Sequence, residues 1–233
     1  MCETPNCRGT TQLDGDFFNR LRPEASQDIA TMEHPSSYPE NVVLFSEEDP
    51  ARGVFVVLDG EVKLSINSSE GRRLNLSIAK RGEILGLAPT LSGNPYEMTA
   101  ETLRPARIGA IARCDFLNFL DRRPETYKIV TEELSRLVSV ACEQLRTLGL
   151  SSSAPKKLAR LLLGWGDRSQ TMEYGTQFRF CLTHGEIGEF IGASRETVSR
   201  TLGKFQREQL IDVHGSMVTI PSRTALINYA HCE

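Results

Sequence analysis

The periodicity of the hydrophobic residues changes once along this chain, at Arg123-Pro124. Between about Pro39 and Ile111, short runs rich in β-branched and aromatic residues alternate with turn residues, a pattern typical of strands. After Pro124, hydrophobic residues recur at alternating steps of three and four, which is the spacing of an α-helix. Strands that precede the helices, instead of alternating with them, predict an α+β fold.

Four runs in the first region have the length of strands: 42–45, 54–58, 62–66 and 74–78. Their regular spacing of roughly 10 residues predicts a sandwich or barrel and argues against βαβ units. The pair Asp59-Gly60, between the second and third runs, is typical of a β-hairpin turn. We therefore expect residues 17–122 to form an all-β sandwich or barrel, after an N-terminal tail of residues 1–16.

Residues 123–150 fit one long helix. Pro124 suits its first turn and Gly149 the position just past its end. Charged residues on the other faces leave one narrow hydrophobic stripe from Tyr127 onward, as a two-helix coiled coil requires. This favours a dimerisation helix, and a helix that packs on its own domain is the alternative. The predicted dimer interface, with Gln144 as its polar member, comprises Val130, Leu134, Leu137, Ala141, Gln144 and Leu148.

Residues 151–233 are predicted to form a second domain. A serine linker at 151–153 leads to Pro155 in the first turn of a helix. Further on, Thr183 and Glu186 have the spacing of a capping box and open a short helix. Gly192 supplies a turn, and Ser194 caps a second helix. Two short helices joined by a glycine-containing turn predict a helix-turn-helix unit.

The second of these helices carries a polar face. Glu196, Ser199 and Arg200 lie at i, i+3 and i+4, opposite the hydrophobic residues, and therefore project together. Arginine can bridge O6 and N7 of guanine, and a carboxylate can accept from N4 of cytosine. An ordinary surface ion pair between Glu196 and Arg200 is the alternative. Hydrophobic runs at 211–213 and 217–220 flank His214-Gly215-Ser216 and predict a hairpin that could lie along a phosphate backbone.

Composition narrows the class of protein. No hydrophobic run approaches the roughly 20 residues of a membrane span, so no membrane partner is expected. Six scattered cysteines in a chain of 233 residues predict a reduced, cytoplasmic protein. Residues 1–150 carry 17 basic and 22 acidic side chains, whereas residues 151–233 carry 10 and 8, which permits a polyanionic partner. The chain lacks a nucleophile elbow, a Walker loop and an HExxH motif, and we do not expect an enzyme.

The order of an all-β domain, a long helix and a winged helix-turn-helix resembles the CRP/FNR family of bacterial transcription regulators from about Phe17 to Ile220, most specifically over Thr183–Phe205. The resemblance implies that residues 17–122 form a β-roll, a jelly roll like that of cyclic-nucleotide-binding domains. The resemblance implies a homodimer on double-stranded DNA, with recognition helices about 34 Å apart on a near-palindromic site, and RNA polymerase as a second partner. A non-DNA-binding adaptor that kept the fold is the rival hypothesis.

The resemblance also implies roles for single residues. Glu196, Ser199 and Arg200 would read bases, in the FNR pattern that reads TTGAT half-sites, whereas Arg195 is typical of the CRP branch and its TGTGA half-site. The residues expected to contact phosphates or to position the helix are Thr183, His184, Ser194, Arg195, Thr197 and Lys204.

The β-roll of this family senses a ligand, and the resemblance places the effector pocket at Gly86, Leu87, Tyr96 and Glu97. Cyclic nucleotide binders use a glutamate for the ribose and an Arg-Ser pair for the phosphate. Leu87 replaces that glutamate, and Tyr96-Glu97 replace the Arg-Ser pair. A carboxylate that faces the cyclic phosphate without a cation would repel it. We do not expect this chain to bind cyclic AMP.

Other effectors are left open. The oxygen sensor of the family holds a [4Fe–4S] cluster on four cysteines, and here only Cys2 and Cys7 are N-terminal, with Cys114 just past the expected strand, so a four-cysteine cluster is not expected. A redox switch of Cys2 and Cys7, or plain tail cysteines, are the alternatives. Haem stays open, with His34 the only histidine of the sensor half. A regulator without any effector fits as well.

Overall fold

The computed structural model describes residues 16–150, 153–166, 171–172, 175–180 and 182–231. The chain divides into two compact units, the first made of Met1–Ile66 and Ser77–Val138, the second of Asn67–Leu76 and Ser139–Glu233. The division thus falls inside the long helix. The sequence, in contrast, predicts a domain boundary at each end of that helix. It also assigns the turn of one β-hairpin to the second unit.

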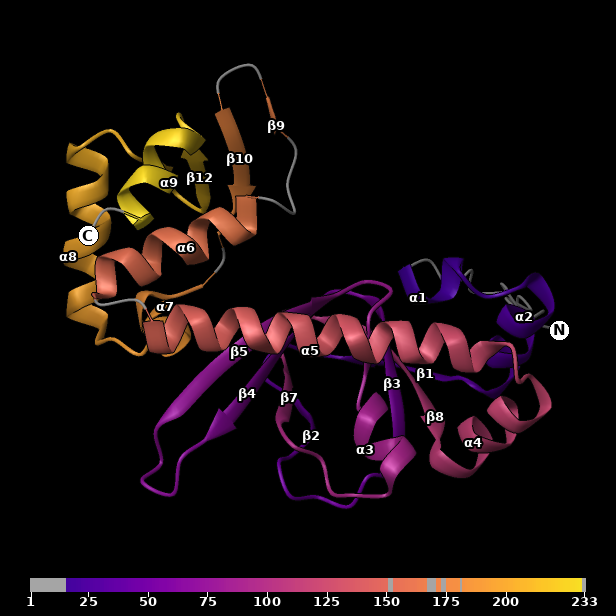
Figure 1. Ribbon diagram of the computed structural model, residues 1–233. Helices are drawn as coiled ribbons and strands as arrows, with labels where there is room; N and C mark the ends of the chain where they lie inside the picture. The colour runs from indigo at the N-terminus through magenta and orange to yellow at the C-terminus, as the bar shows by residue number, and fades with distance from the viewer. Residues whose placement is uncertain (1–15, 151–152, 167–170, 173–174, 181, 232–233) are drawn as a thin grey trace, which may run out of the picture. The chain divides into compact units, whose positions relative to one another are not determined.

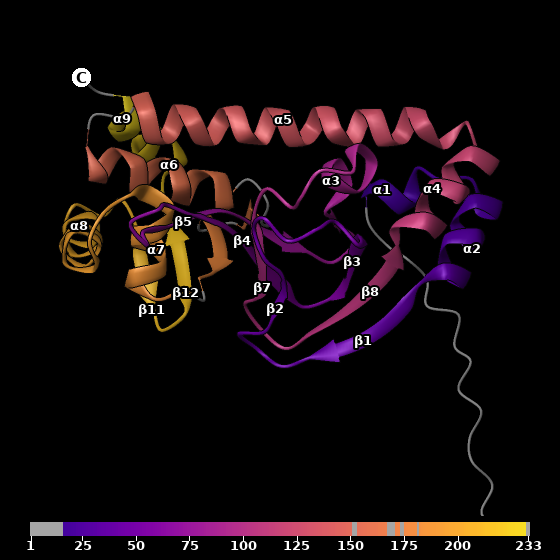
Figure 2. The same ribbon diagram turned by 90° about the horizontal axis from the view of Figure 1, so that it is seen from below.

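The strands of the first unit form two antiparallel four-stranded sheets (Figures 1 and 2). The four predicted runs are all strands. One sheet has the order β1 (His34–Tyr38), β8 (Ala106–Ala112), β3 (Gly53–Asp59) and β6 (Ile84–Leu85). The other has the order β2 (Val43–Phe45), β7 (Thr99–Thr102), β4 (Glu61–Asn67) and β5 (Arg73–Lys80). This arrangement confirms the predicted β-roll within an α+β chain.

The turn at Asp59-Gly60 is not the hairpin turn that the sequence predicts. β3 pairs with β8 and β6, whereas β4 pairs with β7, so the chain passes from one sheet to the other at Gly60. Gly60 has a φ of 88°, and a Cβ there would lie 2.6 Å from the carbonyl oxygen of Pro105. Glycine is therefore needed for the bend and the close approach, and the same residue type serves a crossover as well as a hairpin.

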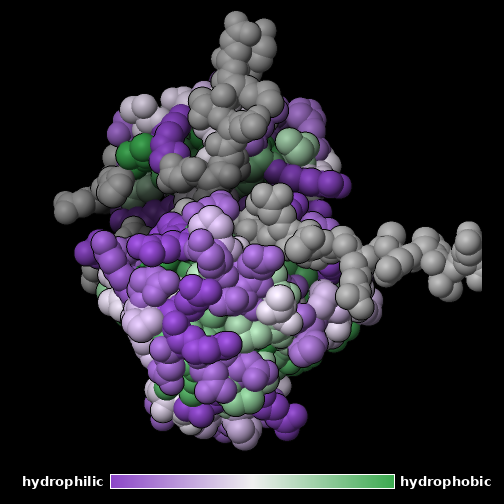
Figure 3. All heavy atoms as spheres, turned by 90° about the vertical axis from the view of Figure 1, so that its right-hand side faces the viewer, coloured by the Kyte–Doolittle hydropathy of each residue, from purple (hydrophilic) through white to green (hydrophobic). Residues whose placement is uncertain are grey.

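Short helices cover one side of this unit, and sequence periodicity did not predict them. They are α1 (Asp16–Asn19), α2 (Pro23–Met32), α3 (Leu87–Ser92) and α4 (Arg113–Arg122). Phe17, Ile29, Phe116 and Phe119 from these helices are buried in one core with strand residues such as Val54. The outer face of this region shows hydrophilic residues with smaller hydrophobic areas between them (Figure 3).

The long helix α5 (Thr126–Leu150) packs on its own β-roll along its first half. Val130 is 2% exposed within the β-roll core, and Leu134 packs against that core. Leu137 and Gln144 are half-buried. Val138 and Leu145, in contrast, are 63% and 70% exposed. The predicted dimer interface is therefore corrected at Val130, because its own β-roll covers that side chain. The exposed hydrophobic residues Val138 and Leu145 each follow a predicted interface residue by one position.

The second unit is a winged helix-turn-helix (Figure 1). Its helices are α6 (Ala154–Gly166), α7 (His184–Ile191), α8 (Arg195–Arg207) and α9 (Arg223–His231). Its sheet has the order β11 (Asp212–His214), β12 (Met217–Ile220), β10 (Gly175–Arg179) and β9 (Thr171–Met172). Trp165 of α6 packs against Phe180 and Phe190, with ring centroids 4.6 and 5.8 Å away.

Within the described residues, no helix is both long and hydrophobic enough to cross a membrane.

Candidate nucleic-acid interface

The start of α7 and the turn to α8 follow the sequence closely. The Thr183 hydroxyl accepts from the backbone N–H of Glu186, and the Glu186 carboxylate accepts from the backbone N–H of Thr183 at 2.9 Å. This is the predicted capping box. Gly192 ends the helix in the left-handed conformation, with a φ of 63°. Both signals of the helix-turn-helix are confirmed.

Gly188 sets how closely the turn approaches α7, and the sequence analysis missed it. A Cβ on Gly188 would collide with the carbonyl oxygen of Ala193. The backbone N–H of Ala193 donates to the carbonyl of Gly188 at 2.9 Å. The angle between α7 and α8 depends on this contact, because the turn could not close over a side chain. Its only signal in the sequence is a glycine four residues before the turn glycine.

The second helix, α8, separates a buried face from an exposed one. The Ser194 side chain caps it by accepting from the backbone N–H of Thr197. Val198, Leu202 and Phe205 are buried, as predicted. Glu196, Ser199 and Arg200 are all exposed, together with Arg195 at the helix start. The predicted polar face thus points away from the core of its unit.

Two members of this polar face have defined partners. The Glu196 carboxylate accepts hydrogen bonds from its own backbone N–H and from the Ser194 hydroxyl. These hydrogen bonds lower the pKa of Glu196, and Arg195 lowers it further. Glu196 is therefore charged and held at the N-terminus of α8, where a carboxylate is favoured. Ser199 Oγ lies 2.6 Å from Nδ1 of His184, the first residue of α7.

The residues predicted to position α8 are brought together, with one qualification at Lys204. Thr183, His184, Ser194 and Thr197 lie around the start of α7 and α8. Lys204 Nζ instead donates to the Tyr229 hydroxyl of α9 at 2.9 Å, and this hydrogen bond raises the pKa of Lys204. Lys204 thus anchors α8 to α9 through its cation. The aromatic partner lies 25 residues further along the chain, where no local pattern indicates it.

The predicted wing is present as the β11–β12 hairpin. Asp212 pairs with Thr219 and His214 with Met217. Gly215 at the tip has a φ of 60°, which favours glycine. His214 Nε2 lies 3.0 Å from the Asp212 carboxylate, and both side chains are exposed. β12 continues into the sheet through β10, so the wing is fixed to the core.

Of the four expected effector residues, Gly86 and Tyr96 lie against each other in the β-roll, and Tyr96 is packed in its core. Tyr96 is 3% exposed and stacks on Phe45 with ring centroids 4.1 Å apart. Its hydroxyl donates to the Gly53 carbonyl at 2.8 Å and accepts from the N–H groups of Arg52 and Gly53. A Cβ on Gly86 would lie 2.8 Å from the Tyr96 ring. The ring therefore fills the space beside the glycine turn.

The other two effector positions offer no ligand for a phosphate. Leu87 is 1% exposed in the β-roll core, and Glu97 is exposed to solvent. A cyclic nucleotide needs a cation at its phosphate and an acceptor at its ribose. A filled aromatic slot, a buried leucine and an exposed carboxylate do not fit that ligand.

The described histidines and cysteines do not gather into a metal site. Among the described residues, no group of three or more His, Cys, Asp or Glu side chains could hold a metal ion. Cys114 and Cys142 are free and exposed, and His34 is exposed in β1. Cys2 and Cys7 lie outside the described residues, and the hypotheses on them stay open.

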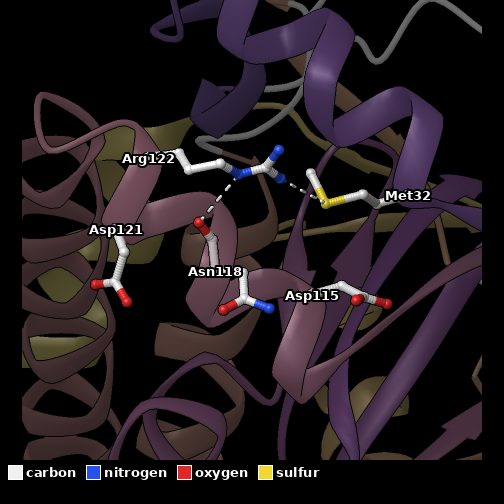
Figure 4. Close-up of a pocket in the computed structure, with 5 residues that line it drawn as sticks. All are labelled: Met32, Asp115, Asn118, Asp121 and Arg122. Atoms are coloured by element: carbon white, nitrogen blue, oxygen red, sulfur yellow. Dashed lines mark hydrogen bonds between the residues drawn. The ribbon is translucent and has the colours of Figure 1, made fainter.

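A pocket between α2 and α4 is lined by Met32, Asp115, Asn118, Asp121 and Arg122 (Figure 4). Arg122 crosses it, with Nε donating to the carbonyl of Asn118 at 3.3 Å and Nη2 lying 4.0 Å from the sulfur of Met32. The carboxylates of Asp115 and Asp121 lie on either side of Asn118. The pocket includes none of the predicted site residues.

A winged helix-turn-helix with an exposed acid, hydroxyl and guanidinium on its second helix defines a DNA-binding protein, and comparisons with known proteins agree. The profile of the Crp-like helix-turn-helix domain matches residues 156–229, and that of the cyclic nucleotide-binding domain matches residues 35–123. The transcriptional activatory protein AadR of Rhodopseudomonas palustris is 32% identical over 95% of this chain and 93% of its own.

A FixK protein and the solved structure of a FixK2 protein are also similar to this chain. The nitrogen fixation regulation protein FixK of Bradyrhizobium diazoefficiens is 29% identical over 82% of this chain and 76% of its own. The solved structure of FixK2 from Bradyrhizobium japonicum superposes with a TM-score of 0.76 at 21% identity, over 86% of this chain and 98% of that one. The chain belongs to the CRP/FNR family of transcription regulators. This is a family of regulators and not of enzymes.

Proposed function

We propose that this chain acts in the cytoplasm as a homodimer that binds a palindromic promoter site in a sequence-specific manner and acts on RNA polymerase. One observation carries the proposal: Glu196, Ser199 and Arg200 stand together on the exposed face of a capped helix. A guanidinium matches the acceptors of guanine, and a carboxylate matches the amino group of cytosine.

The preferred half-site is of the TTGAT type, and TGTGA is the alternative. Glu196-x-x-Ser199-Arg200 supports the first, and the exposed Arg195 supports the second. The described β-roll favours a regulator that needs no cyclic nucleotide, because Tyr96 fills the slot beside Gly86. Thiol, haem and effector-free regulation remain alternatives.

The base-reading role is tested by replacing Arg200 with alanine. We expect Arg200→Ala to lose about 1–3 kcal/mol of binding free energy on the cognate duplex and to relax the preference at one base pair. Fluorescence anisotropy on TTGAT and TGTGA palindromes and on a random duplex gives both values. Arg207→Ala is the matched control, because Arg207 is exposed in the last turn of the same helix.

Two outcomes would contradict the proposal. An equal loss on cognate and random duplexes would make Arg200 a phosphate contact only. Wild-type binding that is weak, blind to sequence and strongly dependent on salt would favour the non-DNA-binding adaptor, since nonspecific binding is electrostatic.

A further inference from the structure

His184 and Ser199 belong to different helices of the helix-turn-helix, 15 residues apart, yet their side chains are in contact. Nδ1 of His184 lies 2.6 Å from Oγ of Ser199. Both side chains are exposed, one at the first residue of α7 and one on the polar face of α8. The close turn at Gly188 and Gly192 fixes the distance between them.

The direction of the hydrogen bond decides what Ser199 offers to other molecules. A serine hydroxyl has one proton to donate and two lone pairs, and an imidazole nitrogen either accepts or donates. If Nδ1 accepts, the hydroxyl proton of Ser199 is committed to His184, and only lone pairs remain. If Nδ1 carries a proton, Ser199 accepts from His184, and its own proton is free.

These two states match different bases. In the major groove, lone pairs match the amino groups of adenine and cytosine, whereas a free hydroxyl proton matches the acceptors of guanine and thymine. A neutral ring that uses its Nε2–H on a phosphate leaves Nδ1 as an acceptor. A protonated ring donates from both nitrogens. The state of His184 therefore selects the kind of base edge that suits Ser199.

We propose that His184 is a specificity-determining positioning residue, which sets the base read by Ser199 through the direction of their shared hydrogen bond. The inference rests on the proposed DNA-binding function and deepens it. It assigns His184 a second role besides the expected phosphate contact.

The helices that carry this pair, and the helix packed against them, hold several charged groups. The Glu186 carboxylate on α7 is already bonded to the N–H and the hydroxyl of Thr183. On α8, one turn before Ser199 and next to it, the charged residues are Arg195, Glu196 and Arg200. On α6, which packs against both helices, they are Lys156, Lys157 and Arg160.

The test compares base preference at two pH values, using the full-length protein and palindromic duplexes in which each half-site base pair is replaced in turn. Ser199→Ala first identifies the base pair that Ser199 reads, as the position where discrimination is lost. At that position we expect the wild-type preference to shift at least about fivefold between about pH 6 and pH 8, toward adenine or cytosine on the contacted edge at the higher pH.

Two variants separate this coupling from a plain phosphate contact. His184→Arg carries a donor at every pH, so the preference should stay that of the lower pH and lose its pH dependence. His34→Gln is the control, because His34 is exposed in β1 and lies outside the helix-turn-helix and the wing. This variant should keep the wild-type shift at the base pair read by Ser199.

The outcomes are distinguishable. A wild type that discriminates among duplexes but shows no shift at this base pair overturns the inference alone, as does a shift that persists in Ser199→Ala. His184→Arg that changes affinity equally on all duplexes also overturns it. A wild type that cannot tell cognate from random duplex at either pH overturns the proposed function, and this inference with it.

Discussion

Tyr96 shows how a single side chain can fill the space beside a glycine turn. Its hydroxyl bonds three backbone groups of Arg52 and Gly53, and its ring stacks on Phe45. The family resemblance predicted that this position lines an effector pocket, but the sequence could not show that the ring turns inward. That orientation depends on Gly53 and Phe45, which lie more than 40 residues earlier in the chain.

Tyr96→Phe tests this inward packing. Removal of the hydroxyl leaves buried backbone groups without a partner, so the free energy of unfolding should fall by about 1–3 kcal/mol in urea titrations. Tyr127→Phe is the control: Tyr127 is 43% exposed, and its change should stay within about 0.5 kcal/mol. An unchanged stability of Tyr96→Phe would mean that the ring leaves the slot in solution.

Glu33 carries a buried carboxyl over the sheet. It is 8% exposed and lies against Gly109 of β8, where a Cβ would collide with it. Burial raises the pKa of Glu33, and Arg107 offsets part of that rise. The folded protein therefore binds this proton more tightly than the unfolded chain does. Stability should fall as the pH rises from the unfolded pKa, about 4.3, through the raised folded pKa.

Glu33→Gln is expected to remove this loss of stability at higher pH. The variant should be more stable than the wild type at neutral pH and show a smaller decrease in unfolding free energy above about pH 4.3. Urea unfolding at several pH values, at one protein concentration, measures this. Glu40→Gln, at an exposed carboxyl, should follow the wild-type curve. A destabilised Glu33→Gln would show instead that ion pairing with Arg107 outweighs burial.

At the scale of elements, the capping and turn signals of the helix-turn-helix were reliable, and signals that depend on distant partners were not. The capping box at Thr183, the cap at Ser194 and the turn at Gly192 depend on neighbours in sequence, and all were predicted correctly. The sheet change at Gly60 and the burial of Val130 depend on which distant strand or core lies opposite. A periodic pattern gives the hydrophobic stripe of a helix but does not say whether its own domain or a partner covers it.

The exposed stripe of α5 yields a prediction on assembly. Val138 and Leu145 are seven residues apart and largely exposed, as coiled-coil positions of an uncovered helix would be. Val138→Asp should weaken dimerisation by at least about tenfold, because each such side chain contributes roughly 1.5–3 kcal/mol when buried. Sedimentation equilibrium measures the change.

Val43→Asp is the matched control, since Val43 is 48% exposed on β2, away from the helix. It should leave the dimerisation constant unchanged. The same result for Val138→Asp and Val43→Asp would place the dimer contact elsewhere. The monomer itself should stay folded in both cases, because surface substitutions rarely change stability by more than about 0.5 kcal/mol.

The chain joins two units of different chemistry. The first combines a β-roll with helices around an aromatic core, and the second presents the polar face of α8. The family was evident from the order of these parts and from the stretch around α8. The sequence left the effector open, and it did not indicate that Tyr96 packs into the β-roll core.

A dimer with one α8 per subunit makes a prediction about the DNA itself. Two recognition helices fixed in one assembly should require half-sites whose centres lie about one helical turn, roughly 10 base pairs, apart. Inserting about 5 base pairs between the half-sites turns one of them to the opposite face of the duplex. Gel shifts should then show affinity close to that of a single half-site. An insertion of about 10 base pairs restores the face but not the distance and should recover little of the loss. If the first insertion left the affinity unchanged, each subunit would bind its half-site independently, and α5 would not hold the two recognition helices together.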